Sequence, residues 1–348
     1  MELDGFNWVS TFTLWRSTPL LLTAPEAEAN SALVLAGVLL SLVVVYFASK
    51  VGGEISNRFG LPPVLGELVG GVIVGVSALN LLVFPEGGSD GTSSLIMQFL
   101  QTTAGLAPEE VAPTFAAQSE VISVLAELGV VILLFEIGLE SNLKELMAVG
   151  IQAAVVAVVG VAVPFGAGTA GLMIWFGVPA VPAIFAGAAL TATSIGITSK
   201  VLSELGTLSS REGQIILGAA VIDDVLGIIV LAVVASLAKT GEVDVGNVIY
   251  LIISASGFLL GAILLGNVFN STFVTIVNRL KTRGELVIPA FIFAFVMSYL
   301  AAAIHLEAIL GAFAAGLVLD ETDKRKELQK QVIPIADMLV PIFFVTVG

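Results

Sequence analysis

Residues 211–238 read REGQIILGAAVIDDVLGIIVLAVVASLA, an apolar run with two adjacent carboxylates, Asp223 and Asp224, close to its centre. A helix needs about 20 predominantly apolar residues to cross the hydrocarbon core of a bilayer. Apart from its polar first turn and the two acids, this run meets that requirement. It therefore predicts a transmembrane helix, and the position of the acids at half depth needs a physical explanation.

The composition of the whole chain agrees with this interpretation. Of the 348 residues, 57% are hydrophobic and 12% are charged, whereas soluble domains contain about 25% charged residues. The chain has no cysteine, which excludes disulfides and thiolate metal sites, and nothing in it predicts a cofactor or a nucleic-acid partner. We therefore predict an all-α, polytopic membrane helix bundle embedded in a lipid bilayer.

Apolar runs separated by polar or Gly/Pro-rich joints predict about ten membrane segments. The first 30 residues carry Glu2 and Asp4 where a signal peptide would have a basic start, so we expect residues 1–30 to be an extracytoplasmic lead-in and residues 31–348 to be the transmembrane domain. The predicted segments are 31–49, 62–84, 119–139, 146–176, 180–203, 211–238, 247–277, 285–304, 306–320 and 331–348.

The basic residues predict an orientation, because Lys and Arg stay preferentially on the cytoplasmic side. With these segments, all basic residues except Arg16 and Lys239 fall in alternate joints. This asymmetry favours the segment count and places the amino terminus outside the cytoplasm, in a bacterial cell membrane or an internal energy-transducing membrane. The longest joint, 85–118, is acidic, and we expect a short helix around 95–106 within it.

The acid pair predicts a function. One charge at the centre of a membrane helix costs about 2.5–3.5 kcal/mol on insertion scales. Two carboxylates this close resist double ionisation, so a proton and a monovalent cation would compete for the same oxygens, which is a mechanism for exchange. The alternative is a pair neutralised by a basic partner or by backbone donors. Because neighbours on a helix point about 100° apart, we expect Asp223 and Asp224 to have different roles.

The segment before the pair contains TATSIGIT at residues 191–198, where Thr191, Thr193 and Ser194 are poor helix formers. Their hydroxyls compete for backbone hydrogen bonds, so we expect the helix to open here. Unwound backbone at membrane depth is tolerated where it lines a cavity, and its carbonyl oxygens suit Na+. The alternative is that these small residues only pack helices together.

Other polar residues within the segments are secondary candidates. Glu67 lies near the start of the second segment, and Glu136 lies in the third, nine residues after Glu127 and therefore on the opposite helix face. Glu136 would either assist ion entry or snorkel towards water. Glycines at four-residue steps predict close helix contacts, and they are Gly66, Gly70, Gly71, Gly75, Gly257 and Gly261.

Six motifs in order resemble the monovalent cation:proton antiporter-2 family, especially its NapA-like Na+/H+ antiporters. The resemblance extends over 61–348 and implies a homodimer of the NhaA/NapA type, in which each protomer has an interface domain and a moving core with discontinuous helices at the ion site. The motifs are GLPPVLGELVGGVIVG (60–75), LAELGVVILLFEIGLE (125–140), TATSIGIT (191–198), VIDD (221–224), LGAFAAGLVL (310–319) and PIFFVTVG (341–348).

The same resemblance implies the roles of the candidate residues. Asp224 would be the principal carboxylate for Na+ and H+, Asp223 its neighbour, and Thr193 with Ser194 the contribution of the unwound helix. Thr191, Glu136 and Glu67 are secondary candidates. Members of that family usually have more helices, so we expect this sequence to lack the second core repeat, and the stoichiometry is not predicted.

The expected activity is Na+/H+ exchange by alternating access, without an enzymatic reaction. Three alternatives stay open at this stage. A Kef-type exchanger would carry K+, and Li+ is a further substrate to test. An intramembrane aspartyl protease is disfavoured because the chain has no Gly-x-Gly-Asp stretch. An ion channel would be separated from an exchanger by whether flux demands a proton gradient.

Overall fold

The computed structural model describes residues 30–76, 78–83, 91–240 and 244–348. These residues form helices and connecting turns, with no strand among them. The predicted lead-in, apart from Asn30, lies outside the described residues. In chain order the elements are α2 (Ser31–Arg58), α3 (Pro63–Val74), α4 (Leu95–Thr103), η1 (Pro108–Glu110), α5 (Val111–Glu140), α6 (Leu143–Ala148), α7 (Gly150–Phe176), α8 (Ala180–Ala189), α9 (Ile195–Glu204), α10 (Arg211–Thr240), α11 (Val245–Val277), α12 (Val287–Ala303), α13 (Ala308–Asp320) and α14 (Arg325–Val347).

Each predicted segment has a helical counterpart, which confirms the all-α prediction. Six helices are long and apolar enough to cross a membrane individually, and four shorter apolar helices accompany them. The segment predicted for 62–84 is too long, because α3 ends at Val74 and the chain then turns. In that turn Asn80 adopts a positive φ of 51°, and its carbonyl oxygen accepts from the N–H of Leu95, 3.0 Å away.

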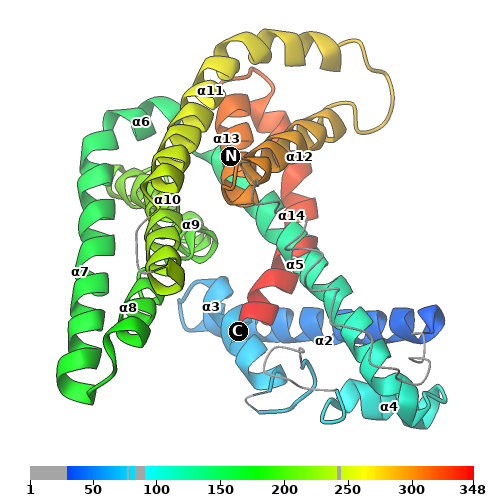
Figure 1. Ribbon diagram of the computed structural model, residues 1–348. Coiled ribbons are helices and arrows are strands. Elements are labelled where there is room, and N and C mark those ends of the chain that lie inside the picture. The colour runs from blue at the N-terminus through cyan, green and yellow to red at the C-terminus, as the bar shows by residue number, and fades with distance from the viewer. Residues whose placement is uncertain (1–29, 77, 84–90, 241–243) are drawn as a thin grey trace, which may run out of the picture.

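The helices form two groups (Figure 1). We call α2, α3, α5, α12, α13 and α14 the α5 group, because α5 packs along both α13 and α14. We call α7, α8 and α10 the α7 group, which lies on the left of Figure 1. The broad core of the α5 group includes Leu133, Leu134 and Phe135, all with no exposed surface. The helix α9 contacts α10 on one side and both α5 and α3 on the other, so it connects the two groups.

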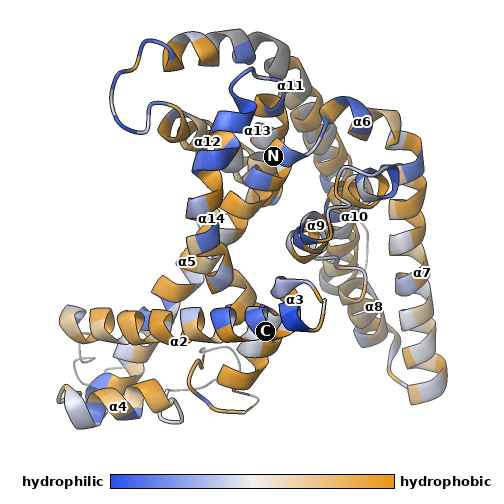
Figure 2. Ribbon diagram, turned by 180° about the vertical axis from the view of Figure 1, so that it is seen from behind, coloured by the Kyte–Doolittle hydropathy of each residue, from blue (hydrophilic) through white to orange (hydrophobic). Residues whose placement is uncertain are grey.

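The outer faces of the long helices are apolar, as a bilayer requires. In α7 the buried residues are Ala153, Ala157 and Val161, and most of the remaining length exposes apolar side chains. Figure 2 shows hydrophobic colour over most of α2 and α7, and hydrophilic colour concentrated near α6 and near the junction of α13 with α14. The chain is therefore a multi-pass membrane protein.

The glycine predictions are confirmed in α3 and wrong in α11. A Cβ on Gly66 would collide with the carbonyl group of Gly52, so α2 and α3 cross with their backbones in contact. By contrast, a Cβ on Gly257 or Gly261 would meet no atom within 4 Å in the part of the chain that the structure describes. The two glycines of α11 therefore face away from the other described helices. A four-residue glycine repeat alone does not indicate which face of a helix is packed.

Candidate functional site

The helix predicted to open at TATSIGIT is broken there. The helix α8 ends at Ala189 and α9 begins at Ile195, which leaves residues 190–194 outside both helices. Ser194 has an extended conformation and its Oγ accepts from the N–H of Ile197 at 3.4 Å, as a helix N-cap does. The Thr191 hydroxyl donates to the carbonyl oxygen of Ala188 at 2.8 Å. The hydroxyls thus satisfy backbone groups that the break leaves unpaired.

The three hydroxyl candidates differ in exposure. Thr191 is 4% exposed, whereas Thr193 and Ser194 are exposed. The Thr193 hydroxyl donates to the carbonyl oxygen of Thr191 at 3.3 Å. Thr193 and Ser194 are therefore accessible at the break, whereas the buried Thr191 hydroxyl is used within the break.

The acid pair lies inside α10, and in the described part of the chain no basic side chain forms an ion pair with it. Asp223 is 7% exposed, and Asp224 is half-buried with an inaccessible Oδ2 that has no hydrogen-bond partner. Within the described ranges, no ion pair and no hydrogen bond engages either carboxylate. Among the described residues, therefore, neither a basic side chain nor a backbone donor neutralises the pair. An unpartnered carboxylate at membrane depth retains its capacity for a proton or a cation.

The structure places the pair and the helix break on contacting elements. The helix α10 packs against both α8 and α9, the two halves of the broken helix. No hydrogen bond joins the aspartates to residues 190–194 in the part of the chain that is described, so the oxygens on the two sides are not bound to one another. Asp224 therefore lies on a helix that packs against both helices flanking Thr193, without a hydrogen bond between the two residues in the described part of the chain.

A further acid near the pair was not predicted. The negative charge of Glu307, in the connection between α12 and α13, acts on Asp224, as does that of the adjacent Asp223. It is exposed at the N-terminus of α13. Nothing in the local sequence around Glu307 indicates this proximity, because it arises from the packing of helices far apart in the chain.

The secondary acids face α9 and not the aspartate pair. Glu136 is 7% exposed and its Oε2 has no partner, so the alternative that it snorkels to water is wrong. Glu67 accepts a hydrogen bond from the Ser49 hydroxyl at 2.7 Å. Lys200, on α9, is a basic neighbour that both glutamates share. These two acids therefore interact with α9, the second half of the broken helix, through Lys200.

With this geometry in place, similarity to known proteins identifies the family. The model of the transmembrane sodium/hydrogen exchanger family matches residues 39–348. This chain belongs to that family. The resemblance inferred from the motifs is therefore confirmed, and an exchanger is a transporter rather than an enzyme, which excludes the protease alternative.

Several curated members of the exchanger family are similar to this chain over most of its length. The high-affinity Na+/H+ antiporter NhaS3 of Synechocystis sp. is 65% identical over 336 residues, which cover 96% of this chain and 72% of that protein. The Na+/H+-K+ antiporter GerN of Bacillus cereus is 31% identical, covering 88% of this chain and 70% of GerN. The probable Na+/H+ antiporter GerT of the same organism is 33% identical, covering 88% and 72%.

Proposed function

We propose that this protein exchanges Na+ for H+ across the membrane by alternating access, and that Asp224 is the carboxylate that both ions use in turn. The observation that carries the proposal is the buried, unpartnered Oδ2 of Asp224 on a helix that packs against both halves of a broken helix. Membership of the exchanger family and 65% identity to a Na+/H+ antiporter support the choice of ions.

The mechanism follows from the cost of a bare charge in a poorly hydrated site. An ionised Asp224 without a partner is unfavourable at membrane depth, and either a proton or Na+ removes that penalty. Because the two ligands occupy the same oxygens, loading one requires release of the other. The loaded, neutral site can then pass between the two sides of the membrane, whereas the empty, charged site resists the passage.

Neighbouring residues would complete the ion site. Hard oxygen ligands suit Na+, and the exposed hydroxyls of Thr193 and Ser194 with the backbone of residues 190–194 can provide them. Asp223 adds negative charge beside Asp224. Thr191 stabilises the break. Glu67 and Glu136 would influence the ion site only indirectly, because their charge interactions are with Lys200 on α9.

The arrangement of the protein in the membrane is also part of this proposal. By the distribution of Lys and Arg, the joint between α9 and α10 and the joint between α13 and α14 face the cytoplasm. The division into an α7 group and an α5 group is what a moving core and a static interface domain of the NhaA/NapA type require. By the same resemblance, the α5 group would form the interface of a homodimer.

Flux measurements with an Asp224→Asn variant test the proposal. Proteoliposomes containing the protein and a pH-sensitive dye should show Na+-driven proton movement, and Asp224→Asn should abolish it because asparagine cannot exchange a proton. Asp323→Asn, the same change at an exposed acid after α13, is the matched control and should retain the flux. Full flux in a folded Asp224→Asn variant would remove Asp224 from the central role.

The same assay decides between Na+ and K+. The name of GerN includes K+, so K+/H+ exchange is the second candidate for this chain. Proton movement driven equally by K+ and Na+ would favour the broader exchanger. Proton movement driven by Na+ and Li+ but not by K+ would favour the Na+/H+ exchanger.

A further inference from the structure

We propose that the end of α9 forms a latch with the α5 group, that this latch closes one end of the ion pathway in this conformation, and that it opens in every transport cycle. The latch consists of Ser203 with Glu140 and of Glu204 with the backbone of Val64. The inference rests on the proposed function, because alternating access requires contacts at one end of the moving helices to break while the other end closes.

Two hydrogen bonds make the latch. The Ser203 hydroxyl donates to Oε2 of Glu140 at 2.8 Å, and Oε2 of Glu204 accepts from the N–H of Val64 at 3.1 Å. Val64 is fully buried in the first turn of α3, where backbone N–H groups have no partner within their own helix. The latch therefore ties α9 to both α5 and α3.

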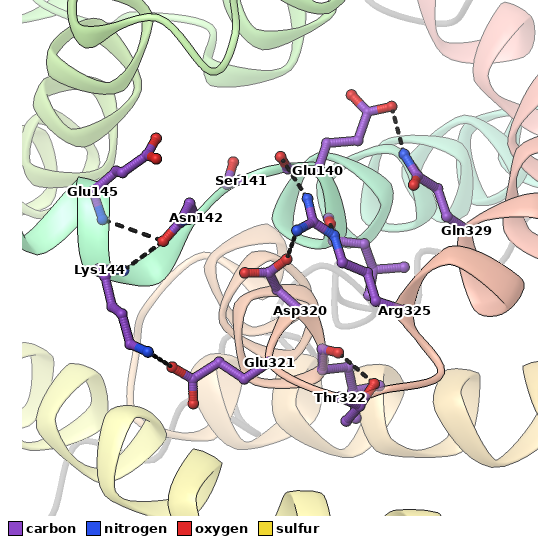
Figure 3. Close-up of polar contacts among 12 residues, drawn as sticks. Glu140, Ser141, Asn142, Lys144, Glu145, Asp320, Glu321, Thr322, Arg325 and Gln329 are labelled. Carbon is purple, nitrogen blue, oxygen red and sulfur yellow. Dashed lines mark hydrogen bonds and ion pairs between the residues drawn. The ribbon is translucent and has the colours of Figure 1, made fainter.

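Glu140 is held firmly on the side of the α5 group (Figure 3). Its Oε1 accepts from Nε2 of Gln329 at 3.1 Å, and its backbone oxygen accepts from Arg325 at 3.2 Å. Arg325 also donates to the backbone oxygen of Leu139 at 2.9 Å and forms an ion pair with Asp320. Glu140 is thus a fixed acceptor built from α5, α13 and α14, and Ser203 is its contact on the side of the broken helix.

Charge attraction supports the same closure. Lys200 lies one turn before the latch residues on α9 and is 4.0 Å from Glu204. It also attracts Glu136 of α5 and Glu67 of α3, although Glu204 on the same helix repels Glu67. A cation on α9 among acids on the opposite group holds the two together, and the attraction depends on their separation.

The surroundings allow these contacts to open. A polar cavity of about 250 Å³ adjoins them, and its lining includes Glu140, Ser203, Leu208, Arg325 and Gln329. Water in such a space can take over hydrogen bonds that the protein groups release. Contacts within the α7 group are different, because α7 and α10 pack through Ala153, Ala157 and Ala219, which form an apolar cluster. The hydrogen bond between Ser203 and Glu140 therefore borders a space that water can enter, unlike the apolar contacts between α7 and α10.

Reversible cross-linking tests whether the latch must open. The chain has no cysteine, so a Glu140→Cys/Ser203→Cys double variant carries the only two thiols. In proteoliposomes, a short thiol cross-linker should bridge the pair and reduce Na+-driven proton flux at least about tenfold, and a reductant should restore it. In the two single-cysteine variants, treatment with the cross-linker should leave the flux at the value that each variant shows before treatment. Cross-linked protein that exchanges as fast as reduced protein would overturn the latch, and so would a folded double variant whose thiols cannot be bridged.

A second measurement does not depend on flux. In a Leu208→Cys background, whose thiol is buried beside the latch, Ser203→Ala should raise the rate of labelling by a polar maleimide about five- to thirtyfold, the factor that corresponds to losing about 1–2 kcal/mol of latch stability. Ser209→Ala, which lines the same cavity, is the control and should leave the rate unchanged. An equal rate in all three proteins would overturn the latch. Absence of Na+-driven flux in the unmodified protein would instead refute the proposed function, so the two failures are distinguishable.

Discussion

Replacing Arg325 with alanine tests the network that anchors the end of α5. The guanidinium pairs with Asp320, with 2.6 Å between Nη1 and Oδ1, and donates to the backbone oxygens of Leu139 and Glu140. The Asp320 side chain is 6% exposed and the Arg325 side chain is 34% exposed. The substitution would leave a buried carboxylate and two carbonyl oxygens at the end of α5 without their donor.

The expected cost follows from this burial. Removing one partner of a buried ion pair costs about 3–5 kcal/mol when the remaining charge stays buried. Because Arg325 is about one third exposed, water can replace part of what it provides, and we expect a loss of about 2–3 kcal/mol of unfolding free energy. Lys324→Ala is the matched control. Its Nζ is 3.1 Å from Glu327, but those side chains are 36% and 55% exposed, and such pairs contribute about 0–1 kcal/mol.

The measurement is reversible unfolding of the purified protein in mixed micelles, followed by circular dichroism as denaturing detergent is added. A double variant with Asp320→Asn removes the stranded charge as well, so its loss should be smaller than the sum of the single losses by about 1 kcal/mol or more. Equal losses for Arg325→Ala and Lys324→Ala, or strict additivity in the double variant, would show that the pair does not anchor this end of the bundle.

Three further predictions address packing and the ion site. Gly66→Ala should destabilise the protein by about 1–3 kcal/mol because its methyl group meets the Gly52 carbonyl, whereas Gly160→Ala, with open space around it in α7, should be neutral or stabilise by up to about 1 kcal/mol in the same unfolding assay. Glu307→Gln should raise the apparent KM for Na+ a few-fold by removing negative charge near Asp224, and an unchanged KM, or the same rise for the exposed Glu285→Gln, would contradict it. Asp223→Asn should lower Na+-driven flux without abolishing it, and complete loss, as expected for Asp224→Asn, would mean that both carboxylates are essential.

The sequence predicts the membrane helices because a single physical requirement acts on every residue of a span. Apolar length alone locates α5, α7 and α10 to within a few residues at most ends. The break at residues 190–194 is predictable for a local reason too, since Thr and Ser side chains compete with the helix for hydrogen bonds. The early end of α3 is not, because it depends on the turn at Asn80 and on a hydrogen bond with Leu95.

Contacts between residues far apart in the chain leave no local pattern in the sequence from which they could be predicted. The partners Glu140 and Ser203 are 63 positions apart, and Glu140 and Gln329 are 189 apart. A serine or glutamate near the end of a membrane helix is ordinarily solvated, so neither residue attracts notice alone. The same reason explains Glu307, and it explains why the sequence left open whether Glu136, which is buried, snorkels towards water.

The positions of energetically unfavourable groups in the structure indicate which part of the molecule moves. Unpaired carboxylates and broken backbone are unfavourable in a membrane, and the break between α8 and α9 packs against α10, which carries the unpartnered Oδ2 of Asp224. The α5 group instead carries buried helix crossings and a firmly bonded junction at Arg325. Because hydrogen bonds beside water exchange readily, relative motion of the two groups should begin at Ser203, whose hydrogen bond to Glu140 borders the polar cavity.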